Sequence, residues 1–235
     1  MRFSGFIILG LLATLSSEPA RAAEVLYDVR ANGFRFGEFR VNIERDAEGY
    51  FVTASADAQG LLGLLIRSKY DGTASGSIGP DGDLIPGKFS ATSTRIFKRR
   101  STQITFTDGK PTEVILSPLK DLTEYSDPTR ISTGRLDSLS YLALMFVAPA
   151  QDCPATTDLY DGRRLTRVDF DPPAFEGGLT VCTGTYAIEA GPDHSLQADQ
   201  RQFLLRLEFQ ASGGSPDQMD IVSGKNEVVF RKAQD

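Results

Sequence analysis

The chain has 235 residues, 25 Lys and Arg against 31 Asp and Glu, and a net charge of −6. A chain this acidic is a poor candidate for binding nucleic acid or anionic lipid head groups, because both repel negative charge. Its length is sufficient for one β-rich domain with a substantial core.

Residues 1–22 have the pattern of a cleaved export signal. Arg2 is followed by an apolar run at 6–15, and Ala20-Arg21-Ala22 is a small-x-small cleavage signal. We therefore expect export to the periplasm and cleavage before Ala23, leaving residues 23–235 as a single soluble β-rich domain. The longest later apolar segment, 136–147, is too short to cross a bilayer, so no transmembrane segment is expected after cleavage.

From Val25 onward, apolar and polar residues alternate with a period of two, which is typical of strands with one buried face. Asn32-Gly33 separates two such runs, 25–30 and 34–44, and predicts a tight hairpin. Lys98-Arg99-Arg100 is expected to be a solvated hairpin tip. Further strands are expected at 50–56, 67–77, 88–97, 102–107, 112–116, 159–170, 179–188, 203–210, 218–223 and 226–231. About a dozen short strands joined by tight turns predict an all-β fold, an antiparallel meander curled into an open barrel or β-spiral.

Residues 135–147 predict the one real helix, with Thr133 as its N-cap and Pro149 marking its end. We expect this amphipathic helix to pack against the concave face of the curled sheet. Ser138 and Tyr141 are expected to face away from its apolar side, which is formed by Leu136, Leu139, Leu142, Ala143, Phe146 and Val147.

Cys153 and Cys182 are the two cysteines, and in an exported protein an isolated pair predicts one disulfide. The alternative is a redox or metal pair, but there is no Cys-x-x-Cys. His194, the single histidine, falls in a polar turn-like stretch and is expected to be a surface residue. We expect no metal and no cofactor.

The common catalytic motifs are missing from the sequence, so no catalytic residue is assigned and a non-enzymatic role is expected. Two segments are candidate ligand-binding residues. The apolar stretch Leu61, Leu62, Leu64, Leu65 and Ile66 is either buried core or a mobile lip at the mouth of the sheet. Arg163 and Arg164 begin a predicted strand, so one should point inward, either to form an internal ion pair or to hold a carboxylate or phosphate head group.

Three blocks of the sequence resemble the bacterial exported family called domain of unknown function 3108. They are Ser138–Leu144 on the helix, Leu159-Tyr160-Asp161-Gly162-Arg163-Arg164, and Cys182-Thr183-Gly184-Thr185-Tyr186. The resemblance extends from Tyr27 to the last strand. A looser similarity, of fold only, links the chain to envelope proteins of the lipoprotein-carrier and β-spiral type, which wrap a sheet around a helix and bind lipid chains or envelope partners.

These observations leave two main hypotheses of function. The first is an exported non-enzymatic protein that maintains the cell envelope by binding a protein or peptidoglycan. The second is a carrier or chaperone for a lipid or another apolar ligand held in the curled sheet. A hydrolase is a more distant alternative.

Overall fold

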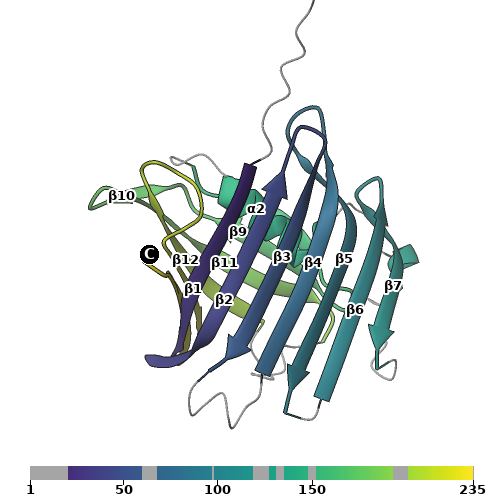
Figure 1. Cartoon of the computed structure of the whole chain (residues 1–235), viewed down its shortest axis with the longest axis horizontal. Helices are drawn as coiled ribbons and strands as arrows, with labels where there is room; N and C mark the ends of the chain where they lie inside the picture. Colours follow the sequence, from purple (N-terminus) through teal and green to yellow (C-terminus); the bar gives the residue numbers. More distant parts are fainter. Residues whose placement is uncertain are drawn as a thin grey trace, which may run out of the picture.

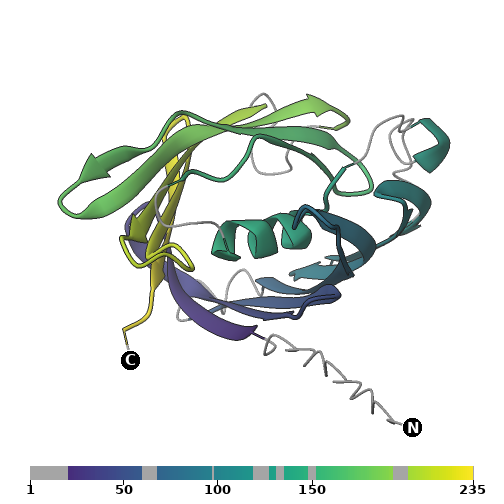
Figure 2. The same ribbon diagram turned by 90° about the horizontal axis from the view of Figure 1, so that it is seen from above.

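A computed structural model describes residues 21–59, 68–96, 98–118, 127–130, 135–147, 152–192 and 201–234. They form one 14-stranded sheet with the strand order β7-β6-β5-β4-β3-β2-β1-β14-β13-β12-β11-β9-β8, and β10 pairs with β11 beside this path. Neighbouring strands pair antiparallel throughout. The sheet curls around one helix, α2 (Figures 1 and 2), which confirms the predicted fold class.

The first seven strands follow one another in space as they do in sequence. They are β1 (Arg21–Ala31), β2 (Phe34–Arg45), β3 (Gly49–Ala58), β4 (Ser68–Ile78), β5 (Leu84–Arg95), β6 (Lys98–Thr107) and β7 (Lys110–Ser117). A short 3₁₀ helix, η3 (Pro128–Arg130), lies against β7, and α2 (Ser138–Val147) follows it.

The second half of the sheet returns to the first through β14, which pairs with β1. Its strands are β8 (Thr157–Tyr160), β9 (Leu165–Phe170), β10 (Ala174–Glu176), β11 (Leu179–Ala190), β12 (Gln202–Gln210), β13 (Gln218–Ser223) and β14 (Asn226–Lys232). The first and last strands are therefore adjacent in the sheet.

The predicted hairpin at Asn32-Gly33 is confirmed. Asn32 has φ 49° and Gly33 has φ 81°, the pair of positive φ angles that a two-residue turn needs to match the twist of its strands. The Asn32 side-chain oxygen also accepts a hydrogen bond from the Glu227 amide at 2.9 Å, which joins this turn to the start of β14.

The structure differs from the strand predictions at three places. Residues 159–170 form a hairpin, β8 and β9, and not one long strand, because the chain reverses at Asp161–Arg164. The short strand β10 was not predicted. The basic run Lys98-Arg99-Arg100 is exposed, as expected, but it belongs to β6, where Lys98 pairs with Arg95 across the turn.

Helix α2 begins at Ser138, and its N-cap is Asp137, not Thr133. Asp137 Oδ1 accepts hydrogen bonds from the backbone amides of Leu139 (3.0 Å) and Ser140 (2.9 Å), as an N-cap side chain does. Tyr141 is also buried, contrary to expectation. The reason is that strands surround the helix, so burial extends well beyond one apolar face (Figure 2).

The core lies between α2 and the inward side chains of the strands. Leu139, Ala143, Met145 and Phe146 of the helix belong to this buried cluster. Tyr27 of β1 packs against Phe146 with ring centroids 6.2 Å apart, and its hydroxyl donates to the Pro216 carbonyl at 2.9 Å. The helix thus packs on the concave side of the sheet.

The segment before α2 bridges the gap between the edge strands β7 and β8. The Arg135 amide donates to the Gly109 carbonyl in the β6–β7 turn (3.2 Å), and the Leu136 carbonyl accepts from the Tyr160 amide at the end of β8 (2.9 Å). The Arg135 guanidinium also forms an ion pair with Asp158 at 2.5 Å. These contacts close the curled sheet without pairing its two edge strands directly.

The predicted disulfide is confirmed. Cys153, which follows α2, is bonded to Cys182 on β11, with their Cα atoms 5.5 Å apart. Cys182 is fully buried in the core cluster. In the part of the chain that is described, no helix has both the length and the apolar character needed to cross a membrane.

Candidate functional site

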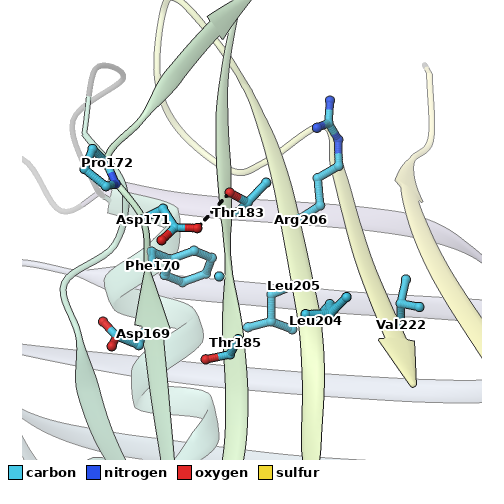
Figure 3. A pocket seen from close by; sticks show the side chains of 11 residues that line it. Asp169, Phe170, Asp171, Pro172, Thr183, Thr185, Leu204, Leu205, Arg206 and Val222 are labelled. Carbon is cyan, nitrogen blue, oxygen red and sulfur yellow. Dashed lines mark hydrogen bonds between the residues drawn. The ribbon is translucent and has the colours of Figure 1, made fainter. Parts of the chain in front are cut away.

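A hollow of about 500 Å³ lies on the outer face of the sheet, over β9, β11, β12 and β13 (Figure 3). Strand alternation places most of its lining side chains on the face opposite α2. The lining combines carboxylates, hydroxyls, one guanidinium and several apolar groups, from Asp169, Phe170, Asp171, Pro172, Thr183, Gly184, Thr185, Leu204, Leu205, Arg206 and Val222.

The acidic wall of this outer pocket comes from the end of β9 and the residue after it. Thr156 donates a hydrogen bond to Asp169 at 2.5 Å, and Thr183 on β11 donates to Asp171 at 3.2 Å (Figure 3). Each threonine fixes the orientation of one carboxylate and leaves its other oxygen able to accept from a ligand.

Arg206 on β12 stands across the outer pocket between two carboxylates. It donates to Glu176 of β10 at 3.1 Å and to Glu208 at 3.0 Å, and these hydrogen bonds raise the pKa of the guanidinium. The bond to Glu176 ties the short strand β10 to β12. Because Arg206 is already engaged, the net field of the pocket is set by Asp169 and Asp171 and is negative.

The apolar part of the outer pocket is unusually open to solvent. Leu204 is 58% exposed, although leucine is most often buried. It lies opposite Val222 in the β12–β13 ladder, so the two side chains form one apolar patch between polar neighbours.

A second group of polar side chains is buried beneath the sheet, at the start of α2. Ser140 donates to Asp137 Oδ2 at 2.5 Å and lies 2.7 Å from the Tyr50 hydroxyl on β3. Burial raises the pKa of Asp137 to about 6, although the hydrogen bonds that its carboxylate accepts act to lower the pKa. It also raises the pKa of Tyr50 and Tyr70. These groups hold the helix in place and have no opening to solvent through the outer pocket.

Arg163 and Arg164 lie in the β8–β9 turn and not on a strand, which corrects their predicted setting. Arg163 is 9% exposed. Arg164 forms an ion pair with Asp161 at 2.9 Å and donates to the Pro192 carbonyl at 2.8 Å. Its contacts are those of a structural residue that fixes the turn.

The other predicted binding segment, Leu61, Leu62, Leu64, Leu65 and Ile66, lies outside the described residues, as does His194. Among the described residues, no group of three or more His, Cys, Asp or Glu side chains is arranged to hold a metal ion.

Sequence reasoning did not identify the outer pocket. One signal was available: Phe203-Leu204-Leu205 is a run of three apolar residues in an alternating strand, so one of them must face outward. The carboxylates gave no such signal, because their proximity to Leu204 depends on the register of β9, β11 and β12.

The fold and this outer surface define the class: a curled antiparallel sheet closed around a helix, with an accessible pocket on its convex side. A family model described as "Protein of unknown function (DUF3108)" matches residues 26–172, and the chain belongs to this family. Among solved structures, the chain is similar to a β-barrel-like protein of domain of unknown function DUF1849 from Brucella abortus. That match has 15% identity and a TM-score of 0.49, and it covers 93% of this chain and 98% of the other. A comparison with curated proteins found no match.

Proposed function

We propose that this protein is exported and acts in the cell envelope, without catalysis, by binding a protein partner through the outer pocket. The observation that carries this proposal is the exposed Leu204 beside the carboxylates of Asp169 and Asp171. An exposed apolar side chain at a hollow, with charge at its rim, has the composition of a recognition site.

The chemistry of the outer pocket defines the partner segment that fits it. The negative wall favours a lysine or arginine, and the patch of Leu204 and Val222 favours an apolar side chain next to it. The hydroxyls of Thr183 and Thr185 add hydrogen-bonding groups for an extended backbone. We therefore expect a segment with a basic residue adjacent to an apolar one.

The packing of α2 on the concave side of the sheet favours partner binding over the carrier hypothesis. A carrier needs apolar volume inside the sheet, and there Leu139, Ala143 and Phe146 of α2 pack against the strands. The residues expected to form an entrance for an apolar ligand, Leu61 to Ile66, are outside the described part. The export pattern of residues 1–22 is the basis for placing the protein in the envelope.

Photo-crosslinking in the bacterium that carries the gene tests this proposal. Benzoylphenylalanine is placed at Leu204, and as a matched control at Ile115, an apolar residue of β7 that is 50% exposed. We expect a discrete protein adduct from position 204 alone, in the periplasmic fraction, on a chain that begins at Ala23.

The adduct partner is then purified, and its dissociation constant is measured for the wild type and for Asp171→Asn. We expect the variant to bind about tenfold more weakly and the wild-type affinity to fall as salt is added, because the carboxylate contributes through charge. A lipid adduct at position 204, equal adducts at both positions, or an affinity unchanged by Asp171→Asn would overturn the proposal.

A further inference from the structure

A second hollow, of about 370 Å³, lies on the outer face of β2–β5, the strands at the front of Figure 1. Strand register arranges its outward side chains in two rows across the sheet. One row is Arg40, Ser55, Asp71 and Thr92, and the next contains Thr53, Thr73 and Ser90. Five of these seven side chains carry a hydroxyl group.

None of these five hydroxyls forms a hydrogen bond within the part of the chain that is described. Some outward threonines elsewhere on the sheet are bonded within the protein. Thr105 of β6 donates to Glu113, and Thr183 of β11 donates to Asp171. The hollow therefore presents a cluster of donors and acceptors that the protein itself does not use, from Thr53, Ser55, Thr73, Ser90 and Thr92.

The charges at this hydroxyl-lined hollow cancel. Arg40 and Asp71 stand in the same row on either side of Ser55. Each also has an ion-pair partner beyond the hollow, Glu24 at 2.5 Å for Arg40 and Lys69 at 3.2 Å for Asp71. A surface balanced in this way has little preference for anions or cations, so its complement is an uncharged polar ligand.

An aromatic ring lies beside the hydroxyls on the same face. Phe51 is two residues before Thr53 on β3, so both side chains point outward, and Phe51 is 43% exposed. A sugar ring has C–H groups on its flat faces and hydroxyls around its rim. An exposed aromatic ring can cover such a face, while neighbouring hydroxyls exchange hydrogen bonds with the rim.

We propose that this hydroxyl-lined hollow binds a neutral glycan, with Phe51 against a sugar ring and the threonine and serine hydroxyls bonded to its hydroxyl groups. This inference goes beyond the proposed function, because it uses none of the residues of the outer pocket. The two sites together would connect a protein partner to a polysaccharide.

Titration calorimetry with defined sugars tests the proposal on the full chain with its disulfide intact. The probes are the tetramers of N-acetylglucosamine and of glucose, with each monosaccharide alongside. We expect at least one tetramer to bind with a dissociation constant below about 1 mM. If a tetramer binds at least about tenfold more tightly than its monosaccharide, the ligand that the hollow recognises is a polymer. Equal affinities identify a free sugar as the ligand.

Thr53→Val with Thr73→Val removes two hydroxyls while keeping side-chain shape and strand preference. We expect this double variant, and separately Phe51→Ala, to weaken binding about tenfold or more. The matched control is Thr105→Val, whose hydroxyl is already bonded to Glu113, and it should bind as the wild type does. Thermal melts establish that each variant is folded.

The proposal is overturned if neither the tetramers nor the monosaccharides bind below about 10 mM. It is also overturned if folded Thr53→Val/Thr73→Val and Phe51→Ala variants bind as tightly as the Thr105→Val control.

Discussion

Ser140 donates a 2.5 Å hydrogen bond to Asp137, and both side chains are completely buried at the start of α2. Ser140 also lies 2.7 Å from the Tyr50 hydroxyl on β3. The helix inside the sheet is therefore attached at its first turn by a chain of three polar groups. Because the Asp137 carboxyl ionises near neutral pH, we expect this attachment to depend on pH.

Ionisation of Asp137 should lower the free energy of unfolding as pH rises. Burial raises its pKa to about 6 in the folded protein from 3.8, so the native state binds the proton more tightly than the unfolded chain does. Its favourable contribution is present below pH 4 and is lost between pH 4 and 6. The size of this loss is about 3 kcal/mol in the free energy of unfolding.

Asp137→Asn should remove this pH dependence, because asparagine is neutral and also serves as an N-cap. We expect its free energy of unfolding relative to wild type to increase by about 3 kcal/mol between pH 4 and pH 7, measured by urea unfolding. Asp81→Asn, at an exposed turn position, controls for the loss of a carboxylate. Parallel pH profiles for wild type and Asp137→Asn would show that the pKa of the buried carboxyl is not raised.

The disulfide should contribute stability without any role in binding. Cys153 and Cys182 close a loop with a sequence separation of 29, and in the chain-entropy model this bridge contributes about 3–4 kcal/mol. Replacing both cysteines by alanine, which avoids a buried hydroxyl at Cys182, should lower the melting temperature measured without reductant. Equal melting temperatures for the two proteins would contradict the prediction.

Leu139 and Leu204 are a buried and an exposed leucine, and comparing their replacement by alanine tests how tightly the helix packs inside the sheet. Leu139 on α2 is 2% exposed and Leu204 on β12 is 58% exposed. Leu139→Ala should cost about 2–5 kcal/mol, because it leaves a cavity between the helix and the strands, whereas Leu204→Ala should change stability by less than about 0.5 kcal/mol. Urea unfolding of both variants measures the difference. Similar losses at the two positions would argue against a helix packed inside the sheet.

Local signals made much of this fold predictable. Asn32-Gly33 defines its hairpin within four residues, and alternation identified most strands to within a few residues. The hairpin at Gly162 was missed although its signal is local: Asp161 accepts hydrogen bonds from the amides of Arg163 (2.8 Å) and Arg164 (2.6 Å), and Gly162 has φ 84°. The burial of Tyr141 and the outer pocket around Leu204 were missed for a different reason, since both depend on how separate strands are brought together.

Gly72 should be required for the close approach of α2 to β4. A Cβ atom at this position would lie 2.6 Å from the Tyr70 hydroxyl and 2.9 Å from a Leu139 methyl carbon, both too close for an unstrained contact. Gly72→Ala should therefore destabilise the protein by about 1–3 kcal/mol, the usual cost of overpacking a core. Gly79→Ala is the control, because its nearest contact would be an ordinary 3.5 Å. If urea unfolding gave the same stability for both variants, the helix would have to sit farther from β4, and the concave side would then have room for a ligand.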